Sequence, residues 1–322
     1  MPPLQASSHH WAITDGRAGN VRQAVALARA LQAGPFKRLA LEPRAPWAWL
    51  APRRLPGSDQ AYGPAFSTLL QTPPPLAIGC GRQAALALRQ LRRRGSQVVQ
   101  ILNPRIPTRH WDLVITPAHD NLRGSNVLTL HGSLNPVNDD WLAWGRIAFG
   151  HIGRLPGPRT AVLVGGPTDH ARWDEAAMAA QFTVLADQVR SLGGSVLATT
   201  SRRTPPAVTQ ALLTAFAGLP GVIWSDGGDG TNPYAGLLGW ADRIAVTPDS
   251  VNLLSEACAT PAPVAVLLPG SAQGRMALFQ QTLLEQGRIH TGIAQLPEQG
   301  QGIVPLRETG RIAAEVRARL GL

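Results

Sequence analysis

The turn after the apolar segment 11–14 carries the first residues suited to chemistry. It reads Asp15-Gly16-Arg17-Ala18-Gly19-Asn20 and opens a helical pattern. Glycine allows a tight turn and a close approach of the backbone to a ligand, and a helix start offers N–H groups to an anion. Asp15 would stand beside such a ligand, where a carboxylate acts as a general base. The alternative is a structural turn in which Asp15 caps the helix.

Two more turns of the first half follow apolar segments. Gly79 and Gly81 flank Cys80, which we interpret as a small buried thiol because no base lies near it in the sequence. His119 precedes Asp120 just after the segment 112–116, and this pair is a second candidate for proton transfer. A structural histidine or a loop cap is the alternative for His119.

In the second half, polar turns follow two neighbouring apolar segments. Gly165, Gly166 and Thr168 follow the segment 160–165. The segment 195–200 is followed by Ser201-Arg202-Arg203-Thr204. Hydroxyl groups and the Arg202 guanidinium suit phosphate oxygens, so we expect both turns to contact a diphosphate. The alternative is a pair of solvated turns.

The most specific stretch runs from Thr247 to Ala257. Asp249 or Ser250 can cap a helix whose first N–H groups receive a diphosphate. Glu256 follows about two turns later and would accept hydrogen bonds from ribose hydroxyls if it faces the ligand. A Gly/Asp loop opens a helix just before this stretch, and its spacing excludes an EF-hand calcium site. We expect Asn232 of this loop to be a further donor-binding residue.

Short apolar runs alternate with longer amphipathic stretches along the whole chain. The runs predict strands at 11–14, 36–41, 76–79, 98–102, 112–116, 126–130, 160–165, 195–200, 221–225, 243–247 and 263–268. The amphipathic stretches predict helices at 19–33, 82–94, 138–149, 174–192, 205–217, 232–240, 250–259, 274–286 and 308–320.

This alternation predicts an α/β fold of parallel sheets with helices on both faces. The series restarts after the Gly/Pro-rich run 150–159, which is typical of a linker. We therefore expect two tandem Rossmann-like, doubly wound domains, 1–155 and 156–306, with the ligand in a cleft beyond the carboxyl ends of their strands.

The charge of the chain is uneven. The sequence has 322 residues and a net charge of +10, and residues 1–155 carry 18 Lys and Arg against 7 Asp and Glu. This excess predicts an anionic partner for the first domain: a membrane surface, a phosphorylated acceptor or nucleic acid, of which a membrane or a phosphorylated lipid is favoured. The alternative is a solvated basic face without a partner. Two cysteines exclude a disulfide framework and point to a reducing, cytoplasmic compartment. No apolar run is long enough to span a bilayer, and the first residues do not resemble a signal peptide.

The segment 43–57 combines tryptophan, leucine and arginine among prolines. Trp47 and Trp49 lie beside Arg53 and Arg54 in this segment. Tryptophan prefers the bilayer interface and arginine attracts anionic head groups, which predicts a shallow peripheral contact with an anionic membrane. The alternative is a loop whose tryptophans are buried against its own domain.

Taken together, these motifs resemble the bacterial branch of the mitochondrial fission (elongated-mitochondria) family, whose members are often labelled nucleoside-diphosphate-sugar epimerases. The resemblance is carried by ITDGRAGN near the start and by the stretch from Asp226 to Ala257, above all Asn232-Pro233-Tyr234. It implies a B-type glycosyltransferase architecture whose last helix, 307–322, packs back on the first domain. It also implies that Ser250 and Glu256 bind the donor and that Gly165 and Gly166 contact its phosphates.

The leading hypothesis is a glycosyltransferase that uses a nucleotide-sugar, with Asp15 or His119 as the base. Positive groups, Arg202 and helix N-termini among them, would stabilise the leaving diphosphate without a metal or a cofactor. A nucleoside-diphosphate-sugar epimerase and a non-catalytic binding or scaffold protein of the same family are the alternatives. No specific nucleic-acid partner is expected.

Overall fold

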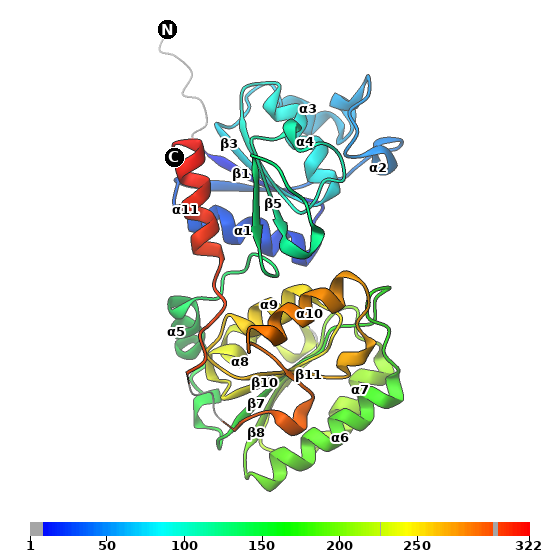
Figure 1. Ribbon diagram of the computed structural model, residues 1–322, viewed down its shortest axis with the longest axis vertical. Coiled ribbons are helices and arrows are strands. Elements are labelled where there is room, and N and C mark those ends of the chain that lie inside the picture. The colour runs from blue at the N-terminus through cyan, green and yellow to red at the C-terminus, as the bar shows by residue number, and fades with distance from the viewer. Residues whose placement is uncertain (1–8, 226, 299–301) are drawn as a thin grey trace. The chain divides into compact units, whose positions relative to one another are not determined.

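The structure, a computed structural model, describes residues 9–225, 227–298 and 302–322 (Figure 1). The chain divides into two compact units. Unit 1 comprises residues up to Pro136 together with Glu308–Leu322, and unit 2 comprises Val137–Arg307.

The division falls after Pro136 rather than near residue 155. Helix α5 (Asp139–Ala148), expected in the first domain, belongs to unit 2 because it packs tightly on α8 (Tyr234–Trp240). A Cβ on Gly145 would lie 2.3 Å from the carbonyl oxygen of Ala235. The Gly/Pro run 150–159 therefore lies within unit 2, where it forms a short 3-10 turn and the first residue of a strand.

Unit 1 contains a sheet of six parallel strands. They are β1 (His10–Thr14), β2 (Phe36–Ala40), β3 (Leu76–Cys80), β4 (Gln97–Ile101), β5 (Leu113–Pro117) and β6 (Val127–Leu130), in the spatial order β2-β1-β3-β4-β5-β6. All the pairings are parallel, as the strand–helix alternation predicts.

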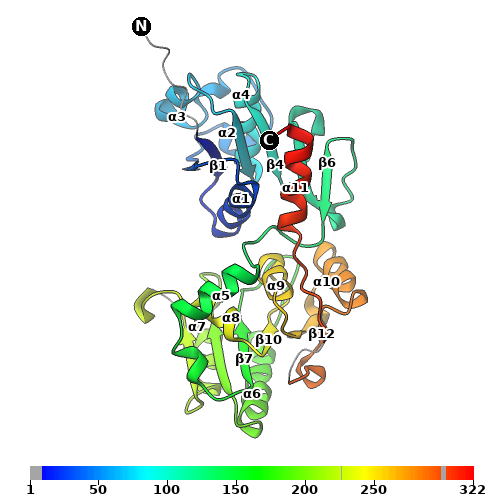
Figure 2. The same cartoon turned by 90° about the vertical axis from the view of Figure 1, so that its left-hand side faces the viewer.

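Helices cover both faces of this sheet. One face is buried by α1 (Ala18–Leu31) and by α11 (Thr309–Leu320), which contributes Ile312 and Val316 to the core and lies beside α1 in both views (Figures 1 and 2). The other face is buried by α3 (Gly63–Leu69) and α4 (Arg82–Arg92). The return of the last helix to the first unit is therefore confirmed.

Unit 2 contains a second sheet of six parallel strands. They are β7 (Arg159–Leu163), β8 (Ser195–Thr199), β9 (Gly221–Trp224), β10 (Arg243–Val246), β11 (Val264–Val266) and β12 (His290–Thr291), in the order β12-β11-β10-β7-β8-β9. Numbered within the unit, this is the 3-2-1-4-5-6 order of dinucleotide-binding folds. Helices α6 (Glu175–Ser191) and α7 (Pro206–Ala215) bury one face. The other face is buried by α5, α8, α9 (Val251–Cys258) and α10 (Arg275–Glu285).

The predicted fold of two Rossmann-like domains is confirmed. The short helices α2 (Trp47–Leu50) and α3 and the two-residue strand β12 were not predicted, because each is too short to show a period in the sequence. Within the described ranges, no helix has the length and apolar character that crossing a bilayer requires.

In an open parallel sheet, ligands bind at the carboxyl ends of the strands where the strand order reverses. That point lies between β1 and β3 in unit 1 and between β7 and β10 in unit 2. Both reversal points hold residues that the sequence singled out.

Candidate functional site

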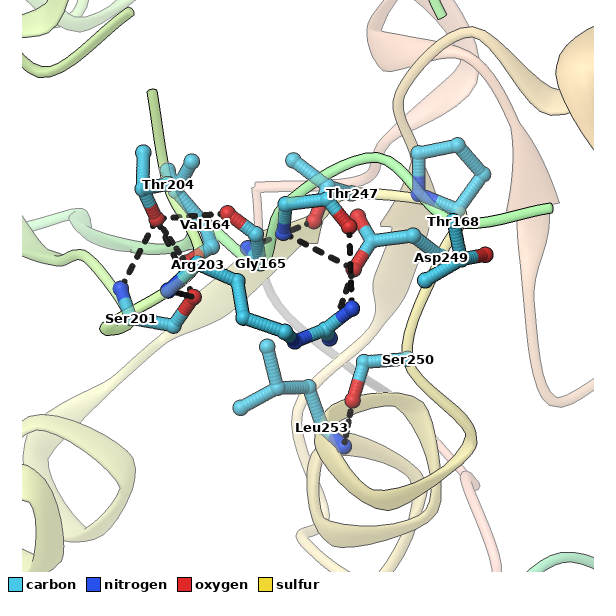
Figure 3. Close-up of polar contacts among 12 residues, drawn as sticks. Val164, Gly165, Thr168, Ser201, Arg203, Thr204, Thr247, Asp249, Ser250 and Leu253 are labelled. Atoms are coloured by element: carbon cyan, nitrogen blue, oxygen red, sulfur yellow. Dashed lines mark hydrogen bonds and ion pairs between the residues drawn. The ribbon is translucent and has the colours of Figure 1, made fainter. Parts of the chain in front are cut away.

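At the reversal point of unit 2, the segments after β7 and β10 are joined by hydrogen bonds (Figure 3). The backbone N–H of Gly165 donates to Oγ1 of Thr247 at 2.8 Å. The N–H of Gly166 donates to Oδ2 of Asp249 at 3.0 Å. Both bonds are buried, so the two turns form one rigid polar layer at the end of the sheet.

Asp249 is the centre of this layer. Its side chain is fully buried, and Oδ1 accepts a hydrogen bond from the indole Nε1 of Trp173 at 3.2 Å. Arg203 reaches the same carboxylate, with Nη2 3.3 Å from Oδ2, and also donates to the carbonyl oxygen of Gly166. A buried carboxylate needs such partners, because an unpaired charge inside a protein is costly.

The two glycines are required by this packing. A Cβ on Gly165 would lie 2.1 Å from Oδ2 of Asp249, and a Cβ on Gly166 would lie 2.1 Å from the carbonyl oxygen of Arg203. Their N–H groups are also occupied by Thr247 and Asp249. Gly165 and Gly166 therefore shape the end of the sheet and do not offer the open phosphate-binding N–H groups that the sequence suggested.

The turn after β8 is tied to the same layer by hydroxyl groups. Thr204 Oγ1 donates to the carbonyl oxygen of Gly165 at 2.5 Å and accepts a hydrogen bond from the N–H of Ser201 at 2.9 Å. Ser201 Oγ accepts from the N–H of Arg203. Ser201 thus stabilises its own turn, and Thr168 does the same in the next loop, where its Oγ1 accepts from the N–H of His170.

The arginine that joins the layer is Arg203 and not Arg202. Arg202 is exposed, and no ion pair or hydrogen bond to another described residue is found for it. The side chain of Arg203 is 51% exposed while its guanidinium contacts Asp249, so one side of this cation faces solvent at the reversal point. The motif was predictable from the sequence, but which of two adjacent arginines turns inward depends on the backbone of the turn.

Helix α9 begins at this point, as predicted. Ser250 is its N-cap, and Oγ accepts a hydrogen bond from the N–H of Leu253 at 3.3 Å. Val251 is the first residue of the helix, where the N–H group has no intrahelical acceptor and the helix dipole is positive. The start of α9 and the Arg203 guanidinium thus form a positively charged surface beside the buried Asp249. We call this surface, made by Ser250, Val251 and Arg203, the electropositive edge.

Glu256 does not present an open carboxylate. The residue is 1% exposed, and Oε2 accepts a hydrogen bond from the hydroxyl of Tyr234 at 2.6 Å. The bond connects the start of α8 with α9, so the expected contact with ribose hydroxyls is not supported by this placement. Asn232 is exposed and accepts a hydrogen bond from the N–H of Tyr234, which sets the turn that starts α8.

The reversal point of unit 1 brings together Asp15, Asn20, Cys80 and Gly81. Oδ1 of Asp15 accepts from Nδ2 of Asn20 at 2.8 Å, and the Cys80 thiol lies 3.5 Å from Oδ1 of Asn20. Gly81 leaves room for Asn20, since its Cβ would lie 2.7 Å from Nδ2. Burial, and to a lesser extent the nearby Asp15 charge, raises the pKa of Cys80, so this thiol stays protonated.

The remaining turn residues of unit 1 have structural roles or stand apart. Gly16 adopts a positive φ of 77° in the turn, and Gly19 lies in the first turn of α1. Gly79 packs against Leu88 of α4. His119 follows β5, three strand positions from β1, which corresponds to about 14 Å at the usual strand spacing. Asp15 and His119 therefore follow strands that are not neighbours in the sheet.

The two tryptophans of the segment 43–57 differ in exposure. Trp47 is half-buried and packs against the core of unit 1, while Trp49 is 72% exposed. The alternative of a loop with both tryptophans buried therefore holds only for Trp47.

Comparison with known proteins identifies relatives over the whole chain. The family model described as "Mitochondrial fission ELM1" matches residues 18–320. The chain is 32% identical to the mitochondrial fission protein ELM1 of Arabidopsis thaliana over 277 residues, covering 77% of this chain and 64% of the plant protein. The chain thus spans just under two thirds of that relative's length. An uncharacterized protein of Rickettsia prowazekii (strain Madrid E) is 26% identical, with 96% and 98% of the two chains covered.

Solved structures share the fold at low sequence identity. The UDP-GlcNAc 2-epimerase of Methanocaldococcus jannaschii superposes with a TM-score of 0.57 at 11% identity, covering 96% of this chain and 99% of that protein. CalG4, the calicheamicin glycosyltransferase, gives a TM-score of 0.52 at 14% identity, with 98% and 99% of the chains covered. At these identities the likeness establishes the fold and no more.

Proposed function

The chain belongs to the mitochondrial fission ELM1 family. We propose that it is a glycosyltransferase whose donor is a nucleoside-diphosphate sugar. The diphosphate binds at the carboxyl ends of β7 and β10 in unit 2. The observation that carries this proposal is the 3-2-1-4-5-6 strand order, which puts the start of α9 at the point where the order reverses.

The electropositive edge supplies the contacts for the diphosphate. The N–H of Val251 and the dipole of α9 attract negative charge, and the half-exposed Arg203 adds a guanidinium. Asp249 holds Arg203 in place through the 3.3 Å ion pair. The contacts therefore come from the helix start and the arginine, while the glycine turn forms the rigid floor behind them.

Asp15 is the candidate for a general base in unit 1. It lies at the other reversal point, its side chain is 18% exposed, and Asn20 orients it through the 2.8 Å hydrogen bond. In the transfer, a general base takes the proton of the acceptor hydroxyl while the acceptor oxygen forms a bond to the anomeric carbon. The bond from that carbon to the diphosphate breaks, and Arg203 and α9 stabilise the charge that collects on the leaving diphosphate.

The names of structurally similar proteins guide the choice of ligand. One is a UDP-GlcNAc 2-epimerase and another a glycosyltransferase, so UDP is the first nucleotide to test. A ligand that binds only the native state raises the melting temperature, so a thermal-shift series over nucleoside diphosphates reveals which nucleobase the protein prefers.

A matched pair of variants tests where the diphosphate binds. Arg203→Gln should weaken UDP binding by about 1–2 kcal/mol, because it removes a half-exposed charge-assisted hydrogen bond. Arg202→Gln removes the same charge one residue away and should leave the affinity unchanged. Equal effects in calorimetry, with both variants folded, would contradict the assignment.

Product analysis separates the reactions. A transferase releases the free nucleoside diphosphate from UDP-GlcNAc or a related donor. An epimerase returns a changed sugar that is still attached to the nucleotide. If UDP binds and no donor is converted with a range of acceptor hydroxyls, the chain is a nucleotide-binding protein and the transferase proposal fails.

A further inference from the structure

A second cationic site lies in unit 1, away from the reversal point. A cavity of about 300 Å³ is lined by Arg54, Arg89, Arg92, Arg93 and His110, which we call the arginine pocket. Its volume is at the lower end of the range for small-molecule sites.

The arginine pocket lies at the amino-terminal edge of the sheet. Arg92, in the last turn of α4, forms a 2.8 Å ion pair with Asp112, the residue just before β5. Oδ2 of Asp112 in turn accepts a hydrogen bond from the N–H of Val98 in β4. Asp15 and Asn20 lie at the carboxyl edge, so the two sites of unit 1 are at opposite ends of its strands.

Few of the positive charges that line the arginine pocket are paired with a carboxylate of the protein. Only Arg92 has a carboxylate partner among the described residues, and Arg89 donates to the carbonyl oxygen of Pro52. Nε of Arg54 is buried without a hydrogen-bond partner in the described part of the chain. Cations near the end of α4 suit its helix dipole, but Arg54 and His110 come from other segments, so the dipole does not explain their presence.

The pKa shifts agree with uncompensated positive charge. Burial lowers the pKa of His110, and the neighbouring Arg89, Arg109 and Arg92 lower it further. Burial and the charge of Arg54 lower the pKa of Arg89. Mutual repulsion of this kind costs folding energy, and a bound anion would offset it.

We propose that the arginine pocket binds a phosphate monoester group. A monoester carries close to two negative charges near neutral pH and three acceptor oxygens, whereas a carboxylate carries one charge and two oxygens. Planar guanidinium groups from α4 and from the segment that holds Arg54 bind such oxygens in pairs. This site is independent of the nucleotide site proposed for unit 2.

The phosphate group can belong to a soluble molecule or to a lipid. The segment that carries Arg54 also carries Trp49, 72% exposed, and Leu55, 44% exposed. Arg82 of α4 donates to the carbonyl oxygen of Trp49 and Arg89 to that of Pro52, so this segment lies along α4. Exposed apolar side chains beside a phosphate site are suited to a membrane interface.

Inorganic phosphate is the first probe. Calorimetry should show saturable binding, and Arg93→Gln should weaken it about tenfold or more, because an exposed guanidinium that lines the cavity is lost. Arg38→Gln, on the exposed edge strand β2, removes the same charge elsewhere in unit 1 and should change nothing. Phosphate should also raise the pKa of His110 in NMR titrations, and this shift should shrink in Arg93→Gln.

Vesicles then distinguish the two sources. If the source is a lipid, the chain binds phosphatidylcholine vesicles that contain phosphatidic acid better than vesicles of equal charge that contain phosphatidylserine, and Trp49→Ser reduces this binding. Equal binding to the two vesicle types, with saturable binding of free phosphate, supports the pocket with a soluble ligand. Absence of any saturable response to phosphate or phosphatidic acid, or equal losses in Arg93→Gln and Arg38→Gln, would overturn the proposal.

Discussion

The backbone N–H of Gly166 donates to Oδ2 of Asp249 at 3.0 Å, across 83 positions of the sequence. The bond joins the residues that follow β7 with those that follow β10, at the place where the strand order of unit 2 reverses. Because Asp249 is buried and also paired with Trp173 and Arg203, the carboxyl end of the sheet is closed by protein groups. An anion therefore approaches from the start of α9 and from the solvent side of Arg203.

Replacement of Gly165 by alanine should destabilise unit 2. The added Cβ would lie 2.1 Å from Oδ2 of Asp249, and Asp249 cannot move without losing its buried hydrogen bonds. Overpacking of this kind costs about 1–3 kcal/mol, measured as a loss in the free energy of unfolding by denaturant titration. Gly270→Ala is the control, because a Cβ there meets no atom within 4 Å. Equal stability of the two variants would show that the close packing at Gly165 is not maintained in solution.

Arg202 and Arg203 differ in a way that the local sequence pattern does not specify. Strand and helix positions follow from periodicity, and the residues after each strand follow from them, so the motifs after β7, β8 and β10 were found. Which side chain of a motif turns inward depends on contacts between distant segments, such as the ion pair from Arg203 to Asp249. Trp173 was missed for the same reason, because nothing near it in the sequence indicates its bond to Asp249.

The glycine pair shows a second limit. Gly165 and Gly166 suggested an open phosphate loop, but the same two glycines are explained by the close approach of Asp249 and Arg203. A glycine in the sequence shows that no side chain is present there, but it does not show whether a ligand or another part of the protein occupies the adjacent space. The arginine pocket is similar, since Arg54 and His110 are 56 positions apart and only the fold brings them together.

Replacement of Ile312 by alanine should loosen unit 1, although the residue lies near the end of the chain. Ile312 is fully buried between α11 and the sheet of unit 1. Loss of a buried isoleucine side chain to alanine costs about 2–5 kcal/mol, so amide exchange should accelerate in α1 and β3 but not in β7 or α6. Val304→Ala, at a 77% exposed position, is the control. Acceleration confined to unit 2 would contradict the assignment of α11 to unit 1.

The two buried cysteines predict a loss of stability at alkaline pH. Burial raises the pKa of Cys258 from 9.0 to about 12 and raises that of Cys80 still further. Between these values the folded chain keeps both thiol protons while the unfolded chain releases them. Stability is therefore full below pH 9 and falls as the pH rises, by about 2 kcal/mol for the two thiols together between pH 9 and pH 10.

Denaturant titrations at several pH values measure this dependence. In the double variant Cys80→Ala/Cys258→Ala, the loss between pH 9 and pH 10 should be smaller by about the contribution of the two thiols, roughly 2 kcal/mol. Both thiols should also resist alkylation in the native state at pH 8.5 and react fully in denaturant. An unchanged pH dependence in the double variant would show that the thiols are accessible or already ionised in the folded chain.

The central claim, that a nucleoside diphosphate binds at the start of α9, is tested most directly by calorimetric titration of UDP into the native chain and into Val251→Pro. Proline fits the first position of a helix, and Ser250 before it already has the extended backbone that proline requires, with φ −119° and ψ 108°. The substitution therefore removes one N–H group and preserves the helix. We predict that UDP binds the native chain and that Val251→Pro weakens this binding about tenfold, for the loss of one charge-assisted hydrogen bond. An unchanged dissociation constant in a folded Val251→Pro variant, or no binding of any nucleoside diphosphate to the native chain, would contradict the account.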